Sequence, residues 1–181
     1  VIDNCAMAGR SSKTFREEGR LDDIAAHIRP GDLLVVSFGH NDANRAKAER
    51  YVPADAFGES LRPFWDAARS HGAVCIFASP VAMREFDEAG VCHPSFAAYR
   101  EAMRAFAAEV GAPFIDLGAA TAAANTAFGA ECCKARYMWV GAKQDNAHQQ
   151  SAGACRTAQA FVQQLLQDTT PALDVLRANF K

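Results

Sequence analysis

The sequence predicts an α/β fold, a three-layer α/β/α sandwich in which helices cover a parallel sheet. Short apolar runs typical of buried strands alternate with stretches whose apolar residues recur every three or four positions. Strands that alternate with helices favour parallel pairing, because each crossover returns the chain to the same end of the sheet. The 181 residues, half of them hydrophobic, suit one domain, residues 1–181, with a full-sized core.

Four segments are expected to form strands, namely residues 1–7, 32–38, 73–80 and 112–117. The segments 32–38 and 73–80 are nearly continuous apolar runs, so we expect both faces of these strands to be covered. Cys75 lies in the second of these runs and is expected to be a small buried side chain.

Helices are expected between these strands and after the last of them. The residues predicted to face the core are Leu21, Ile24, Ala25 and Ile28 in the first helix, Phe57, Leu61, Phe64, Trp65 and Ala68 in the second, Phe96, Tyr99, Met103, Phe106 and Val110 in the third, and Ala154, Ala158, Phe161, Val162 and Leu165 in the last. Pro30 and Gly31 should end the first helix. The stretch 118–144 is expected to begin as an alanine-rich helix and become irregular, and residues 168–181 are expected to form a peripheral tail.

The composition argues against several classes of protein. A formal net charge of -2 gives no electrostatic basis for binding nucleic acid. No apolar run approaches the roughly 20 residues of a membrane span, so a membrane partner is not expected either. None of the six cysteines is spaced as Cys-x-x-Cys, which disfavours a zinc knuckle. Disulfide pairing and oligomeric state stay open.

Polar side chains follow the predicted strands at three places. The segments Met7–Ser12 (MAGRSS), Gly39–Asp42 (GHND) and Asp145–Gln150 (DNAHQQ) each come where a strand or the connection before a helix ends. Right-handed crossovers bring the carboxyl ends of parallel strands to the same rim, where open α/β sheets bind their ligands. The sequence therefore predicts a site built from these three segments.

The residue types in these segments suit acyl transfer. His148 can be a general base, and Asp145, three residues earlier, can hold its imidazole in one tautomer. Asn41 offers an amide donor and Gly9 an unobstructed backbone N–H for a developing oxyanion.

A metal site built from His40, Asp42, Asp145 and His148 is the alternative for these groups. The acyl-transfer interpretation also accounts for the Gly9 and Asn41 donors, so no metal is expected.

Three segments together resemble a known family. The second, third and fifth sequence blocks of the SGNH (GDSL) hydrolases resemble NCAMAGRSSKTFREEGR, PGDLLVVSFGHND and DNAHQQSAGA, respectively. Within that family the resemblance is greatest to the rhamnogalacturonan acetylesterase group. The resemblance extends from Val1 to about Leu166. It implies a flavodoxin-like SGNH hydrolase fold and a serine esterase that removes acetyl groups from a pectin-like or rhamnogalacturonan-like polysaccharide without a cofactor. It also favours an extracellular or periplasmic location.

The same resemblance assigns roles to individual residues. Gly9 and Asn41 match the oxyanion-hole residues, His148 matches the general base, and Asp145 matches the aspartate of the triad. Two neighbours depart from the family pattern, since Ala147 and Gln149 stand where members often have threonine and an aromatic residue.

The family's first block, a central strand that ends in Gly-Asp-Ser, has no counterpart in these residues. We therefore expect an N-terminally incomplete domain whose nucleophilic serine lies outside the 181 residues. Ser11 and Ser12 are expected to shape the turn or cap a helix, and Arg10 to brace the turn through a salt bridge. Tyr137 and Trp139 are expected to pack in the core or at its rim. The alternatives are an SGNH enzyme for another acyl ester and a non-catalytic fragment.

Overall fold

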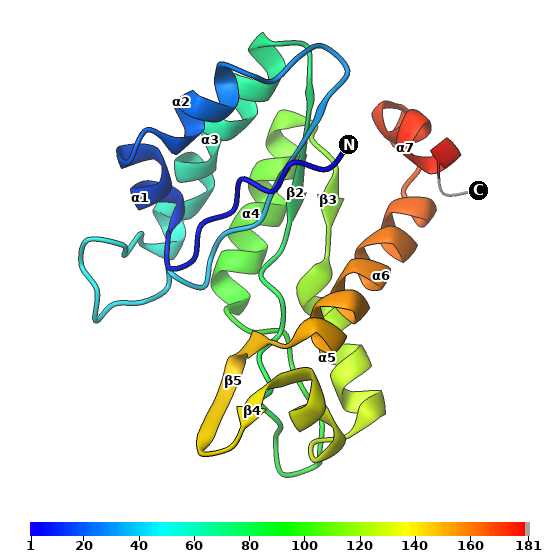
Figure 1. Cartoon of the computed structure of the whole chain (residues 1–181). Helices are drawn as coiled ribbons and strands as arrows, with labels where there is room; N and C mark the ends of the chain where they lie inside the picture. The colour runs from blue at the N-terminus through cyan, green and yellow to red at the C-terminus, as the bar shows by residue number, and fades with distance from the viewer. Residues whose placement is uncertain (180–181) are drawn as a thin grey trace. The chain divides into compact units, whose positions relative to one another are not determined.

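The chain folds into helices and a parallel sheet, so the predicted α/β class is confirmed (Figure 1). A computed structural model describes residues 1–179. The chain forms two compact units, one made of Val1–Ser79 and Ala98–Phe114 and the other of Pro80–Ala97 and the residues from Ile115 onward. Of the predicted site residues, Gly9 and Asn41 lie in the first unit, and Asp145 and His148 lie in the second.

The main sheet contains β1 (Leu33–Val36), β2 (Val74–Ala78) and β3 (Phe114–Ile115), in that spatial order. β1 and β2 pair in parallel, with Leu33 opposite Val74 and Val36 opposite Phe77. Four of the five β2 residues, Cys75 among them, are buried, as their apolar run predicts. In β1 the prediction of two covered faces is wrong, because Val35 is 49% exposed on a strand at the edge of the described sheet.

The prediction of a strand at residues 1–7 is also wrong. All seven residues are exposed, and the segment pairs with no strand of the part of the chain that the structure describes. An apolar pattern makes a strand only where the backbone finds a partner for its N–H and C=O groups. Here the side-chain amide oxygen of Asn4 accepts from the Ala6 N–H instead.

The first predicted helix corresponds to α2 (Arg20–Ala25), and the segment before it, which was expected to be a loop, forms a second short helix, α1 (Ser12–Glu17). Gly19 has a φ of 74°, a left-handed conformation that a glycine adopts without a steric penalty. The side-chain oxygen of Ser11 accepts from the backbone N–H of Thr14, and the Thr14 hydroxyl oxygen accepts from the backbone N–H of Ser11. The expectation that Ser11 caps a helix is therefore confirmed.

The longer helices α3 (Ala54–Ser70) and α4 (Ala97–Val110) have the buried faces that their periodicity predicts. Their buried residues are Phe57, Leu61, Phe64 and Ala68 in α3 and Tyr99, Met103, Phe106 and Ala107 in α4. Aromatic contacts join these helices to the sheet, with ring centroids 5.5 Å apart for Phe77 and Phe106 and 5.1 Å apart for Phe38 and Phe64. Trp65 is only partly buried, and the Arg69 guanidinium lies over its ring.

The stretch 118–144 begins in a helix, as predicted, but the part expected to be irregular contains a β-hairpin. Helix α5 (Leu117–Phe128) and the short 3₁₀ helix η1 (Cys132–Arg136) are followed by β4 (Tyr137–Val140) and β5 (Lys143–Gln149). The strands pair antiparallel through a two-residue turn that begins at Gly141, whose φ is 58°. Two-residue hairpin turns favour a glycine with positive φ at this position, so the Gly141 signal was present in the sequence.

The final helix, α6 (Ser151–Gln167), lies where it was predicted, and Phe161 and Val162 are half-buried as expected, but the buried face differs from the prediction in the first half of the helix. Leu165 is buried as predicted, whereas Ala154 and Ala158 are exposed and Gly153 is buried instead. The reason is a close backbone contact, because a Cβ at Gly153 would lie 2.2 Å from the carbonyl oxygen of Arg136. The absence of a side chain at this position lets α6 approach η1.

The tail from Asp168 forms helical turns, η2 (Pro171–Leu173) and α7 (Asp174–Asn179), and Leu173 is fully buried. Residues 180–181 of the predicted tail lie outside the described residues. Among residues 1–179, no helix combines the length and the apolar character that crossing a bilayer requires. All six cysteines are free thiols, of which Cys75, Cys92 and Cys133 are buried.

Gly153→Ala should destabilise the fold, because the new methyl group would overlap a backbone oxygen that cannot move cheaply. We expect the free energy of unfolding to fall by about 2 kcal/mol or more. Gly58→Ala in α3 is the matched control, since its Cβ would lie 3.3 Å from the Cβ of Phe106, an overlap that a shift of a few tenths of an ångström relieves. Chemical unfolding of both variants measures the difference, and equal stabilities would contradict the close contact at Gly153.

Candidate functional site

A buried carboxylate, Asp42, organises the turn that follows β1. Its Oδ1 accepts hydrogen bonds from the backbone N–H of Ser12 at 2.9 Å and from the Ser12 hydroxyl at 2.6 Å. Its Oδ2 accepts from the backbone N–H of Gly39 at 3.0 Å. Burial raises the pKa of Asp42, while these hydrogen bonds from Ser12 and Gly39 act in the opposite direction. Asp42 therefore ties the start of α1 to the end of β1.

Ser12 is consequently a structural residue. Ser11 and Ser12 are both fully buried, and the hydroxyl groups of both make hydrogen bonds within the turn. This geometry agrees with the expectation that these serines shape the turn and cap the helix. Sequence reasoning considered Asp42 only as a metal ligand, and nothing in the spacing of Ser12 and Asp42, 30 residues apart, pointed to their bond.

Gly9 and Asn41 lie together in the same unit. Gly9 has a φ of 77°, in the left-handed region. The Asn41 amide nitrogen, Nδ2, donates to the carbonyl oxygen of the next residue, Arg10, at 3.1 Å. The Asn41 oxygen, Oδ1, accepts from Nη1 of Arg50 at 3.2 Å. Both ends of the Asn41 amide are therefore fixed against this turn, and Nδ2 has a second N–H to donate.

Arg10 braces the turn in the manner expected. Its Nε lies 2.9 Å from Oε1 and 3.0 Å from Oε2 of Glu18, and its Nη1 donates to the carbonyl oxygen of Ala8 at 3.0 Å. The hydrogen bonds from Arg10 and Arg20 lower the pKa of Glu18. Arg10 is thus engaged within the turn, and Arg50 is the cation beside Asn41.

Asp145 and His148 lie together on β5, in the second unit, rather than on the loop that was predicted. Nδ1 of His148 lies 2.8 Å from Oδ2 of Asp145. Oδ1 of Asp145 accepts from the backbone N–H groups of Ala147 and His148, each at 2.9 Å. The hydrogen bond from the His148 backbone and that from Ala147 are the main causes that hold the pKa of Asp145 well below its usual range, and the His148 ring adds to them.

This arrangement defines the state of the imidazole ring. An ionised carboxylate can only accept hydrogen bonds, so Nδ1 of His148 carries the proton that is donated to Asp145. In the neutral ring, Nε2 then has a lone pair available to take a proton. The His148 side chain is 78% exposed, whereas that of Asp145 is only 18% exposed. Asp145 and His148 can therefore act as an orienting acid and a general base.

Arg84 and Trp139, which no sequence motif marked, hold β5 at Asn146, the residue after Asp145. The guanidinium of Arg84 donates twice to the carbonyl oxygen of Ala130 and once, at 3.1 Å, to Oδ1 of Asn146. The indole N–H of Trp139 donates to the same Asn146 oxygen at 2.9 Å. The backbone N–H of Arg84 also donates to the Asn146 carbonyl at 2.7 Å. Asn146, next to Asp145, is thus held on both its side chain and its backbone.

The two aromatic residues before the turn have packing roles, as expected. Tyr137 is 1% exposed, and its hydroxyl donates to the carbonyl oxygen of Ala82 at 2.7 Å. The cationic groups of Arg84 and Lys134 each lie 4.7 Å from the centre of the Trp139 ring.

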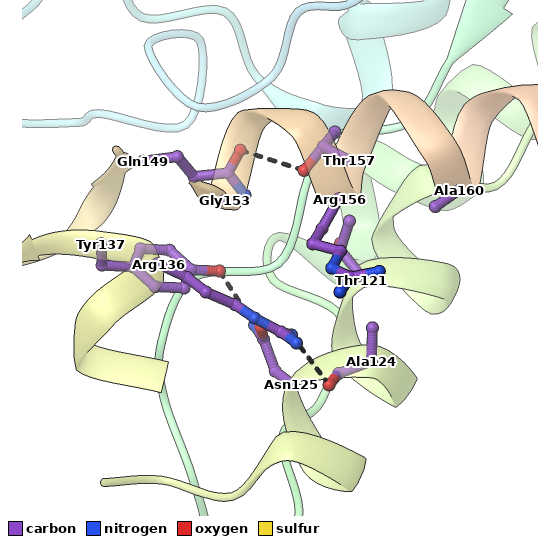
Figure 2. Close-up of a pocket in the computed structure, with 10 residues that line it drawn as sticks. All are labelled: Thr121, Ala124, Asn125, Arg136, Tyr137, Gln149, Gly153, Arg156, Thr157 and Ala160. Atoms are coloured by element: carbon purple, nitrogen blue, oxygen red, sulfur yellow. Dashed lines mark hydrogen bonds between the residues drawn. The ribbon is translucent and has the colours of Figure 1, made fainter. Parts of the chain in front are cut away.

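A small pocket in the second unit lies against the end of β5 but contains neither Asp145 nor His148 (Figure 2). Its lining residues bond to one another. Gln149 accepts from the Thr157 hydroxyl at 3.0 Å, Asn125 donates to the Tyr137 hydroxyl oxygen at 2.9 Å, and Arg136 donates to the carbonyl oxygen of Ala124. The pocket lies where β5 is followed by α6, and Gln149 at the end of β5 forms part of its lining.

Within residues 1–179, the structure contains no group of three or more histidine, cysteine, aspartate or glutamate side chains that could hold a metal ion. Asp42 is bonded to Ser12 and Gly39, and Asp145 to His148.

The chain is similar in sequence to a known protein family and to curated relatives. Residues 1–153 match the GDSL-like lipase/acylhydrolase family. The chain is 35% identical over 185 residues to the rhamnogalacturonan acetylesterase RhgT of Bacillus subtilis, covering 97% of this chain and 78% of that protein. It is 44% identical over 115 residues to the probable rhamnogalacturonan acetylesterase YesY of Bacillus subtilis, covering 63% of this chain and 52% of that protein.

The fold has a counterpart among solved structures. The crystal structure of protein YxiM of Bacillus subtilis matches 95% of this chain and 47% of its own, with a TM-score of 0.85 and 28% identity. The α/β fold and its sequence blocks are those of an SGNH hydrolase. The chain belongs to the GDSL-like lipase/acylhydrolase family, and the resemblance inferred from the sequence is confirmed. The chain spans about half the length of YesY and of the YxiM structure.

Asp42→Ala should destabilise the first unit strongly, because two N–H groups and the Ser12 hydroxyl would lose a buried acceptor. We expect the free energy of unfolding to fall by about 3–4 kcal/mol. Asp66→Ala, at an exposed position of α3, is the control and should change it by less than about 0.5 kcal/mol. Urea unfolding measures both, and a small effect at Asp42 would contradict its structural role.

The depressed pKa of Asp145 predicts a pH-dependent contribution to stability. The unfolded chain binds a proton at this carboxyl near pH 3.9. The folded carboxylate resists protonation, so its contribution is complete above that pH and is lost as the pH falls through the folded pKa. The stability difference between the wild type and Asp145→Asn should therefore be smaller at about pH 2.5 than at about pH 5. Urea unfolding at the two pH values measures it, and an unchanged difference would contradict the assignment.

Proposed function

We propose that this protein is a serine esterase that removes acetyl groups from a polysaccharide of the pectin or rhamnogalacturonan type. The observation that carries the proposal is the Asp145–His148 pair, whose carboxylate is bonded to Nδ1 and leaves Nε2 to act as the base. Family membership and the names of the curated relatives, the rhamnogalacturonan acetylesterase RhgT and the probable rhamnogalacturonan acetylesterase YesY, support the choice of acetyl ester and polysaccharide.

In the proposed reaction, His148 takes the proton of a serine hydroxyl as the serine oxygen bonds to the acetyl carbonyl carbon. The backbone N–H of Gly9 and the free N–H of Asn41 donate to the oxyanion that forms. The carbon–oxygen bond to the sugar then breaks, and His148 returns its proton to the sugar oxygen. Water repeats the sequence on the acetyl-serine, releasing acetate and restoring the serine hydroxyl.

The proposal takes the serine from outside the 181 residues. The sequence contains no Gly-Asp-Ser, and Ser11 and Ser12 are fully buried in structural hydrogen bonds. A buried hydroxyl that already serves the turn is poorly suited to attack a polysaccharide, which supports a separate nucleophile.

His148→Ala in the full-length protein, with its serine, should reduce kcat for acetate release from acetylated rhamnogalacturonan by at least about 10³-fold. The reason is the loss of the proton acceptor for the serine. His93→Ala is a matched control, because His93 is also exposed and its Nε2 lies 2.7 Å from Oδ2 of an aspartate, Asp87, in the same unit. Enzymatic measurement of released acetate compares the variants.

Each outcome of this assay separates the interpretations. Loss of activity in His148→Ala but not in His93→Ala supports the proposed base, and equal activities contradict it. A preference for long-chain p-nitrophenyl esters over acetylated polysaccharides would favour another acyl substrate. No ester hydrolysis by the full-length wild type would favour a non-catalytic protein.

A further inference from the structure

The guanidinium of Arg50 lies beside both residues proposed to bind the oxyanion. Its Nη1 donates to Oδ1 of Asn41 at 3.2 Å. Its Nη1, Cζ and Nη2 atoms lie 3.7–3.9 Å from the position that a Cβ on Gly9 would occupy. The Arg50 side chain is 33% exposed, so it is held against the protein along most of its surface. No motif in the sequence pointed to Arg50.

The loop that carries Arg50 is anchored to Asp42, the residue that organises the turn containing Asn41. The backbone N–H of Val52 donates to the carbonyl oxygen of Asp42 at 3.0 Å. The hydroxyl of Tyr99, on α4, donates to the Val52 carbonyl oxygen at 2.7 Å. The nearest carboxylate, that of Glu49, lies 3.7 Å from the Arg50 Nε and is 61% exposed, so it competes weakly for the guanidinium. The hydrogen bonds at Val52 fix the backbone next to Arg50, and its side chain reaches Asn41 from this position.

The contact with Arg50 decides which way the Asn41 amide faces. A carboxamide has an accepting oxygen and a donating nitrogen, and a half-turn exchanges them. A guanidinium can only donate, so it stabilises the orientation in which Oδ1 faces Arg50 and opposes the reverse, which would bring two donors together. The Arg10 carbonyl, which accepts from Nδ2, selects the same orientation. The remaining N–H of Asn41 is then available to a substrate oxygen.

We propose that Arg50 is a positioning residue that holds the Asn41 amide with its N–H group directed to the oxyanion of the reacting ester. This inference rests on the proposed esterase function. It predicts an effect on the transition state, where charge develops on the oxygen, and little effect on binding of the neutral ester. A guanidinium that instead bound a carboxylate of the substrate would act on KM, and only for uronate-containing polymers.

The test is a double-mutant cycle in the full-length protein with p-nitrophenyl acetate, a small neutral ester. Arg50→Ala should lower kcat by about 10-fold and change KM by less than about twofold. Arg50→Lys keeps a donor and should recover part of that loss. In an Asn41→Ala background, Arg50→Ala should lower kcat by less than about twofold, because the group that it positions is gone.

Arg62→Ala is the matched control, since the Arg62 side chain is 34% exposed and hydrogen-bonded to Glu59 and Glu109 in the same unit. It should leave kcat unchanged. Melting temperatures verify that each variant is folded, and Arg50→Lys tests the inference if Arg50→Ala does not fold.

Three results would overturn the inference while leaving the esterase intact: a wild-type kcat in Arg50→Ala, an equal loss in the Asn41→Ala background, or an effect confined to KM for uronate-containing substrates. An inactive full-length wild type would overturn the proposed function, and this inference with it.

Discussion

Burial of the Asp42 carboxylate is the constraint on which the first unit depends. A carboxylate loses its hydration when buried, and in compensation it must receive hydrogen bonds from the protein. Asp42 receives three, from two segments that lie about 30 residues apart in sequence. Its own carbonyl oxygen accepts from Val52. Asp42 therefore fixes three segments relative to each other: the turn after β1, the first turn of α1 and the loop that contains Val52. These segments in turn set the positions of Gly9, Asn41 and Arg50.

Asp145 has a different role, since it orients an ionisable ring. Its side chain is largely covered but remains ionised, because two backbone N–H groups and the ring of His148 donate to it. Asp42 holds segments together, whereas Asp145 holds a neighbouring ring in one tautomer and orientation. The difference lies in the donors, since Asp42 receives its hydrogen bonds from structural groups and Asp145 receives one from a titratable ring.

The positions of Asn41 and of the strand that carries Asp145 and His148 depend in part on Arg50, Arg84 and Trp139, which lie outside the family motifs. Asn41 is held by Arg50 and by the Arg10 carbonyl, and β5 is held by Arg84 and Trp139 through Asn146. Groups that are supported in this way keep one geometry without reorganising during a reaction, which is the condition for efficient electrostatic stabilisation. Arginine suits both supports, because its fork of N–H groups can satisfy several acceptors at once.

The sequence by itself determined the α/β class, the three strands of the sheet and the buried faces of α3 and α4, and it pointed to the residues of the two proposed pairs. These are local properties, since periodicity and short motifs are written within a few neighbouring residues. The strand predicted at residues 1–7 failed because strand formation depends on a backbone partner that the segment's own residues cannot supply.

The tertiary structure decided what the motifs alone could not. The buried face of α6 depends on the contact between Gly153 and the Arg136 carbonyl, and the roles of Asp42, Arg50 and Arg84 depend on partners from 9 to 62 residues away. A hydrogen bond between distant residues leaves no periodic trace in a single sequence. Only the folded chain brings such donors and acceptors within reach of each other.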